Sequence, residues 1–121
     1  MKGILIMIAT GLSLTFNVFA ETSELEFLAG VEAGIDTETA MSNTDLEFTQ
    51  HVLTSQPIGI ARSWYNDDTS TLYNIKIVKY FQQNKHACVS YDLIIHHNEA
   101  LDIKPLTACL NQQGNWIASL S

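Results

Sequence analysis

Two cysteines, Cys88 and Cys109, carry the most nucleophilic side chains of the 121-residue sequence. They stand near the outer ends of two strand-like runs that meet at the polar step Asn98-Glu99, midway between them. A two-residue loop at that step sets the cysteines opposite each other in a non-hydrogen-bonded pair, with a Cα separation of roughly 4.5 Å. Such a pair is within bridging distance. The spacing therefore predicts a hairpin closed by a disulfide.

Pro105 favours the same register. Counting residue pairs outward from the Asn98-Glu99 loop pairs the two cysteines and also places Pro105 opposite Asp92 in another non-hydrogen-bonded pair. At such a position the hairpin does not require the N–H that proline lacks. No C-x-x-C spacing is present, so in an exported chain a disulfide is favoured over a metal site or a redox pair. A bridged Cys88 and Cys109 cannot act as nucleophiles.

The hairpin tip also suggests a metal site. His96 and His97 precede Asn98-Glu99, with Asp92 and Asp102 nearby, and imidazole and carboxylate groups suit zinc or nickel. Adjacent residues of a strand point to opposite faces, which argues against one ion between the two histidines. The sequence has no G-x-S-x-G elbow and no H-E-x-x-H helix. We therefore expect a polar tip, no metal, no cofactor and no enzymatic activity.

The N-terminus has the pattern of a secretory signal peptide. A positive start at Met1-Lys2 precedes an apolar run, Ile4 to Leu14, and Val18-Phe19-Ala20 ends it with small residues at the positions that a signal peptidase reads. The alternative, a membrane anchor, is less favoured because polar residues interrupt a run shorter than the roughly 20 apolar residues of a membrane span. We expect residues 1–20 to be removed on export to the periplasm, the outer membrane or the cell surface, with no integral span remaining.

Charge divides the rest of the chain. Residues 21–47 hold eight acids and no Lys or Arg, whereas five acids and five basic residues follow from residue 48 onward. Nucleic acid is not expected as a partner, because phosphate binding needs clustered Lys and Arg. Residues 21–41 are predicted to be an acidic leader, either a solvated spacer or a short helix on the spacing of Leu25, Leu28 and Val31. A basic protein partner would also suit such a leader.

Residues 42–121 are predicted to form one small domain. A helix is expected to begin at Ser42, Asn43 or Thr44, with Asp45 and Glu47 in its first turn, and to end before Pro57. Five β runs follow, two of which form the hairpin. The expected ranges are Ile58 to Tyr65, Thr71 to Phe81, the two hairpin strands, and a short end strand from Asn115 to Ser119.

On the third β run, Val89, Tyr91, Leu93 and Ile95 share one face, and we expect the helix to pack there. The predicted fold class is therefore α+β. An N-terminal helix packs on one face of a four- to five-stranded antiparallel meander sheet that holds one cross-strand disulfide.

A resemblance rests on four short motifs, which are Trp64-x-Asn66, Cys88-x-x-Tyr91, Thr107-Ala108-Cys109 and Gly114-x-Trp116. Their order and spacing resemble the C-terminal domain of the rickettsial-type seventeen-kilodalton surface antigen family, over about residues 44 to 118. The resemblance implies a non-enzymatic protein of the Gram-negative cell envelope, associated with the outer membrane. It also implies structural roles for the residues of the pattern, namely Trp64, Asn66, Tyr91, Gly114 and Trp116.

The chain departs from that family at several positions. It has no lipobox cysteine at the predicted cleavage point, and Gly30 and Gly34 are all that corresponds to the family's glycine-zipper segment. The basic residue usual after each cysteine is replaced by Val89 and Leu110. Lipid anchoring and a charged role at those two positions are therefore not carried over.

Three functions are compatible with the sequence. The favoured one is a structural or interaction protein of the envelope, whose partner is an envelope protein, peptidoglycan or an outer-membrane component. The second is a periplasmic inhibitor of a basic enzyme such as lysozyme, since acidic surfaces steer cationic partners. The third is a small-ligand-binding domain with a cavity between helix and sheet, lined by Tyr73, Tyr91 and Trp64. For Trp64 and Trp116, packing in the core is favoured over a ligand groove.

Overall fold

The computed structural model of the chain describes residues 26–34 and 38–119. The predicted signal peptide, 1–20, and the first part of the acidic leader, 21–25, lie outside these residues. In chain order the elements are η2 (Val31–Gly34), α1 (Asn43–Ser55), β1 (Ala61–Asn66), β2 (Thr71–Gln83), β3 (His86–His97), β4 (Ala100–Leu110) and β5 (Trp116–Ala118).

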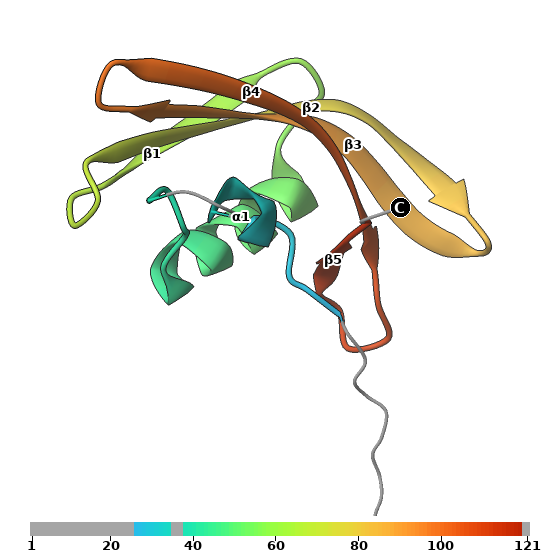
Figure 1. Cartoon of the computed structure of the whole chain (residues 1–121). Helices are drawn as coiled ribbons and strands as arrows, with labels where there is room; N and C mark the ends of the chain where they lie inside the picture. Colours follow the sequence, from blue (N-terminus) through green and yellow to red (C-terminus); the bar gives the residue numbers. More distant parts are fainter. Residues whose placement is uncertain (1–25, 35–37, 120–121) are drawn as a thin grey trace, which may run out of the picture.

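The five strands form one antiparallel sheet in the order β1-β2-β3-β4-β5. The sheet is curved, and α1 and η2 lie on its concave side (Figure 1). The predicted meander and its preceding helix are thus confirmed. The α+β class is confirmed only in part, because the described chain is mostly strand and its one α-helix has 13 residues.

Helix α1 begins where the sequence provides a cap. The Ser42 side chain accepts a hydrogen bond from the Asp45 N–H (3.2 Å), and the Asp45 carboxylate accepts one from the Ser42 N–H (3.0 Å). This reciprocal arrangement satisfies backbone donors that the first turn leaves free. At the other end, Gln56 leaves the helical conformation before Pro57, whose ring restricts the residue that precedes it.

The core lies between α1, η2 and the concave face of the sheet. Val52 and Leu53 of α1 are buried against side chains that alternate along the central strands. Those strand residues are Tyr73, Ile75 and Ile77 of β2, Val89, Tyr91, Leu93 and Ile95 of β3, and Ala108 of β4. The helix therefore packs on the Tyr91 and Leu93 side of the sheet, as the sequence predicts.

Strand β2 contains one extra residue, Val78, relative to β3. Ile77 pairs with Tyr91 and Lys79 with Ser90, so two steps along β2 correspond to one step along β3. A bulge of this kind changes which face the following residues occupy. Tyr80 consequently points to the concave side, where its hydroxyl donates to the carbonyls at the end of α1.

Part of the acidic leader is packed on the sheet. Leu28 forms a β-bridge with Ile117, the Ala29 N–H donates to the Trp116 carbonyl (3.0 Å), and Glu32 is buried. Gly30 permits this close approach, because its φ is 106° and a Cβ there would lie 2.7 Å from the Met41 sulfur. From residue 26 to 34 the leader is therefore not a solvated spacer, and its turn of helix is the 3₁₀ segment η2.

Candidate functional site

The disulfide predicted from the spacing is present. Cys88 and Cys109 are paired across β3 and β4 with a Cα separation of 4.0 Å and are bonded through their sulfurs. Asp92 is paired with Pro105, as the same register requires. The pair is a covalent cross-link of two strands, and neither sulfur is a free thiol.

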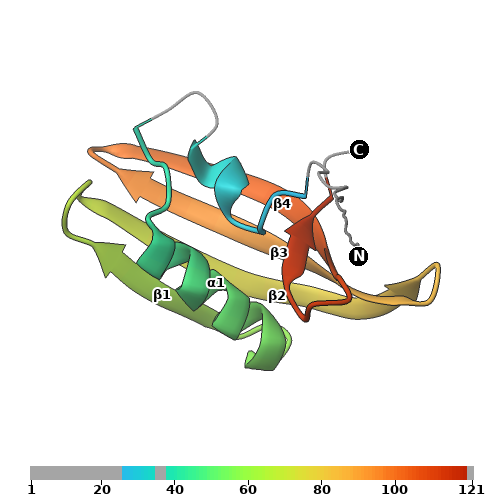
Figure 2. The ribbon, with the colours of Figure 1, turned by 90° about the horizontal axis from the view of Figure 1, so that it is seen from below.

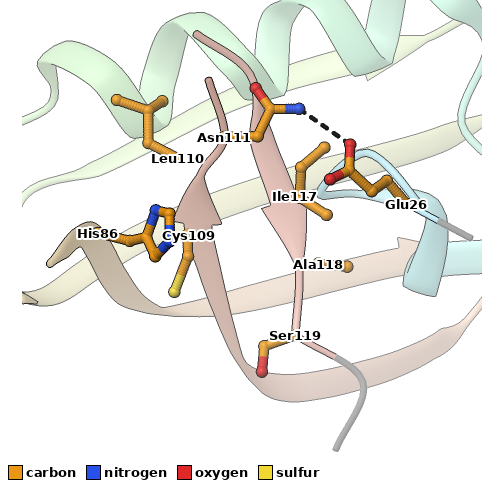
Figure 3. A pocket seen from close by; sticks show the side chains of 8 residues that line it. All are labelled: Glu26, His86, Cys109, Leu110, Asn111, Ile117, Ala118 and Ser119. Carbon is orange, nitrogen blue, oxygen red and sulfur yellow. Dashed lines mark hydrogen bonds between the residues drawn. The ribbon is translucent and has the colours of Figure 1, made fainter. Parts of the chain in front are cut away.

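A pocket of about 280 Å³ lies beside this cross-link, open to solvent (Figure 3). Half of its lining side chains are polar. Glu26 already accepts a hydrogen bond from the Asn111 amide (3.1 Å), and the His86 imidazole lies on the opposite wall. The lining residues are Glu26, His86, Cys109, Leu110, Asn111, Ile117, Ala118 and Ser119. With its sulfur bridged to Cys88, Cys109 provides no nucleophile to this pocket.

The two histidines of the hairpin tip do not converge. His96 is exposed on the convex face, whereas His97 lies in register with Thr71, whose hydroxyl is 3.0 Å from its Nδ1. The Nε2 of His97 is 3.4 Å from the Glu38 carboxylate, which is itself largely exposed. Within residues 26–34 and 38–119, no three His, Cys, Asp or Glu side chains are grouped to hold a metal ion.

Trp64 and Asn66 converge on Asp45. The Trp64 indole N–H donates to one carboxylate oxygen of Asp45 (3.0 Å), and the Asn66 amide donates to the other (2.5 Å). Trp64 also stacks on Phe48, with ring centroids 4.9 Å apart. Two alternate residues of β1 thus hold the start of α1. The sequence indicates Asp45 as a first-turn acid, but its partners 19 and 21 residues away were not foreseen.

The remaining pattern residues also have structural positions. Trp116 is buried, and its indole N–H donates to the Thr54 hydroxyl (3.0 Å). The Gln50 side-chain amide donates to the Trp116 carbonyl and accepts from the Trp116 N–H. Gly114 occupies the turn before β5 with a φ of 85°, a conformation that other residues adopt at a cost. Both tryptophans therefore serve packing, and neither lines the pocket.

Two buried tyrosines fill the space between helix and sheet. Burial, and after it the charge of Asp45, raises the pKa of Tyr73 to about 12, and its hydroxyl donates to the Thr39 carbonyl (2.6 Å). Burial and the Glu32 charge raise the pKa of Tyr91, whose hydroxyl has no hydrogen-bond partner among the described residues. These rings pack in the core and occupy the space in which the third candidate function, small-ligand binding, requires a cavity lined by Tyr73, Tyr91 and Trp64.

The convex face of the sheet has no helix or strand over it in the described part of the chain (Figure 1). Residues on this face lie in rows across the strands. One row is Tyr65, Leu72, His96 and Leu101, and the next is Ser63, Asn74, Ile94 and Ile103. Tyr65, Leu101 and Ile103 are each more than half exposed, at 56, 56 and 55%. The sequence analysis does not assign residues to this surface, although the alternation of side chains along each strand indicates which of them share a face.

Among the described residues, no helix reaches the length and apolarity that crossing a membrane requires. Comparison with protein-family models, with curated proteins and with solved structures finds no match to this chain. The resemblance to the surface antigen family therefore remains a prediction from the residues.

Proposed function

We propose that the chain is an exported, surface-antigen-like α+β protein of the bacterial cell envelope that acts by binding and not by catalysis. The observation that carries this proposal is the uncovered convex face of the sheet. Antiparallel sheets often leave one face to water, but that face is then polar. Here its rows combine large apolar side chains with few charges, a composition typical of interaction surfaces.

The concave face cannot serve this purpose, because α1 and η2 already occupy it. Figure 2, the view from below, shows α1 and η2 lying over this face of the sheet, with α1 running nearly along β1 and β2. The disulfide supports a binding role because it fixes β3 against β4, the two strands that provide Ile94, Leu101 and Ile103. A rigid surface loses little conformational entropy when a partner binds.

Site-specific photo-crosslinking in living cells tests the binding face. A photoreactive residue at Ile103 is expected to give a discrete adduct with an envelope component. The same residue at Glu47, exposed on α1, serves as the control and is expected to give none. Equal labelling from Ile103 and Glu47, or labelling from neither, would contradict the proposed use of the convex face.

Export is tested separately by cell fractionation and intact mass. We expect the protein in the envelope fraction, shorter by residues 1–20, without attached lipid and two hydrogens lighter than the dithiol form. Recovery of the full-length chain from the cytosol with both thiols free would overturn the envelope assignment.

A second candidate function, inhibition of a basic enzyme, is favoured by one end of the sheet. The β1–β2 loop and the β3–β4 turn meet there in the same row of the sheet. The exposed acids at this end are Glu38, Asp67, Asp68, Glu99 and Asp102. Binding to a cationic lysozyme, weakened by salt and by Asp67→Asn with Asp68→Asn, would favour this function; no binding at low salt would exclude it.

A further inference from the structure

Three of the five Lys and Arg residues in the described part of the chain lie on β2 and the β2–β3 turn, away from the acidic end of the sheet. Residues 69–91 contain Lys76, Lys79 and Lys85 and no Asp or Glu, although the whole chain has a net charge of −7. This stretch forms β2 and the start of β3. The β2–β3 turn is at the opposite end of the strands from Asp67, Asp68 and Glu99. The molecule therefore carries a separation of charge along its sheet.

The β2–β3 hairpin extends beyond its neighbours (Figures 1 and 2). Strand β1 pairs with β2 as far as Lys76, and β4 pairs with β3 only from Cys88 onward. The outer part of the hairpin, residues 78–87, is flanked by no other strand among the described residues. Its tip is the tight turn at Asn84 and Lys85, which have φ values of 52° and 70°. The hairpin is thus a projecting, basic feature.

Exposed apolar side chains gather at the base of this projection. Ile58 and Ile60 flank Gly59, whose N–H donates to the Ile77 carbonyl (2.9 Å) and so holds this loop beside β2. Ile58, Ile60, Val78 and Tyr80 are exposed by 57, 56, 48 and 40%. Of these four side chains, Tyr80 is also held to the end of α1, because its hydroxyl donates to the Leu53 and Gln56 carbonyls. The same end of the molecule therefore presents both apolar and cationic groups.

Lysine and aromatic groups are also interleaved on the hairpin itself. The Lys79 ammonium lies 5.3 Å from the centroid of the Phe81 ring, on the face that the bulge at Val78 assigns to both. Lys85 is at the turn. Long cationic side chains beside aromatic rings suit an interface between water and hydrocarbon, where the ring enters the apolar region and the ammonium remains in water.

We propose that this end of the molecule docks on an anionic lipid surface. Lys79 and Lys85 bind the phosphate headgroups, and the apolar side chains around Val78 enter the boundary of the acyl region. The charge separation supports this occupant, because it directs the hairpin towards a negative surface and the Glu99 end away from it. Nucleic acid is a poorer fit, since two hairpin lysines neutralise few phosphates and the apolar groups would find no partner.

This docking goes beyond the proposed binding function, since it uses different residues and leaves Ile94, Leu101 and Ile103 of the convex face free for their own partner. The two can fail independently: loss of lipid binding would not alter crosslinking from Ile103 to a soluble component.

Flotation with vesicles tests the proposal on the full chain. Vesicles of phosphatidylglycerol and phosphatidylethanolamine are compared with vesicles of phosphatidylcholine alone. One lysine near an anionic surface changes partitioning by about 5-fold, so Lys79→Gln with Lys85→Gln is expected to weaken binding by about 30-fold. Lys104→Gln, on β4 outside the hairpin, removes an ammonium that pairs with Asp102 (3.2 Å); it is the control and is expected to leave vesicle binding unchanged. Equal weakening by Lys104→Gln, or equal binding to neutral vesicles, would overturn the proposal.

A second measurement reports the orientation even if the N-terminal segment itself binds lipid. A fluorescent residue at Gln83, beside the hairpin turn, is expected to be quenched by brominated lipids. The same residue at Thr69, in the β1–β2 loop, is expected to remain bright. Quenching at Thr69 but not at Gln83 would reverse the orientation, and quenching at neither would exclude docking by this end. An acidic protein as the true partner would leave both probes unquenched on vesicles.

Discussion

At the scale of single residues, Asp45 is the group on which the most contacts depend. Its two carboxylate oxygens accept hydrogen bonds from the Ser42 cap, the Trp64 indole and the Asn66 amide. Asn66 in turn accepts from the backbone N–H groups of Asp68 and Thr69. One buried acid therefore fixes the start of α1, the end of β1 and the following turn in one arrangement.

Replacing Asp45 with alanine is expected to lower the free energy of unfolding by about 3 kcal/mol, since two buried donors lose their acceptor and the cap is weakened. Urea denaturation followed by circular dichroism measures the loss. The structure places Asp45 in the first turn of α1 and Glu47 beyond it, contrary to the prediction for Glu47. Glu47→Ala removes an exposed acid near the start of the same helix and is expected to change stability by less than about 0.5 kcal/mol. Similar losses for both variants would mean that the helix dipole, and not the Asp45 contacts, is the cause.

Tyr73 and Tyr91 are both buried, yet their hydroxyl groups differ. Tyr73→Phe removes a hydrogen bond to the Thr39 carbonyl and is expected to cost about 1 kcal/mol. Tyr91→Phe removes a hydroxyl that has no partner among the described residues, so we expect unchanged or slightly increased stability. Thermal unfolding of the two variants side by side measures the difference. A larger loss for Tyr91→Phe would show that its hydroxyl is bonded, for example through a buried water to Glu32 Oε2.

Residue types predicted some of these roles but not others. Ser42 as a cap and Asp45 in the first turn follow from local rules that act within four residues. The convergence of Trp64 and Asn66 on Asp45 depends on how α1 lies across β1, which no local rule specifies. The burial of Glu32 is even harder to predict from residue types. An acidic segment favours solvation, and this one packs on the sheet because Ala29, Gly30 and Ala33 are small.

At the scale of elements, the hairpin of β3 and β4 could be predicted in full register. The loop position, the cysteine spacing and Pro105 all point to one pairing, and each is a property of a short stretch of sequence. The bulge in β2 could not be predicted, because Val78 continues an apolar run and nothing in its type marks it as the extra residue. With the extra residue, Tyr80 lies on the concave face and reaches the end of α1.

Removing the disulfide tests how much the cross-link contributes to the hairpin. Cys88→Ala with Cys109→Ala is expected to lower the free energy of unfolding by about 3 kcal/mol, because the sulfurs close a loop of 21 residues. The measurement is urea denaturation at fixed pH. Reducing the wild-type protein should give a similar loss, and a stability unchanged by either treatment would contradict the role assigned to the bond.

At the scale of the whole molecule, alkaline pH is expected to destabilise the fold. The pKa of Tyr73 rises from its ordinary value of 10.0 to about 12 on burial, and that of Tyr91 is raised as well. Between pH 10 and 12 the unfolded chain releases the Tyr73 proton while the folded chain keeps it, so stability is present below pH 10 and falls as the pH rises. The fall is about 1.4 kcal/mol per pH unit for each such tyrosine.

The fraction of folded protein, followed by circular dichroism across this range, measures the slope. Tyr73→Phe is expected to make the slope shallower by one proton. A slope that Tyr73→Phe does not alter would place the titrating group elsewhere.

The separation of charge, the projecting hairpin and the uncovered convex face are also properties of the whole molecule. Composition alone indicates an acidic protein, yet the sheet gathers acids at one end and lysines towards the other. This arrangement depends on which strand ends adjoin, so it follows from the topology and not from any single segment.

The extra residue in β2 has a consequence for how this chain tolerates insertion and deletion. With Val78 set aside, the residues of β2 alternate between the two faces without interruption, from Thr71 to the hairpin turn. Deleting Val78 would therefore preserve which side chains face α1, whereas deleting any regular neighbour would require the bulge to vanish or would exchange the faces of Lys79 and Tyr80. Val78 is thus the position in β2 where a change in chain length alters the curvature of the strand but leaves every other side chain of the strand on its present face of the sheet.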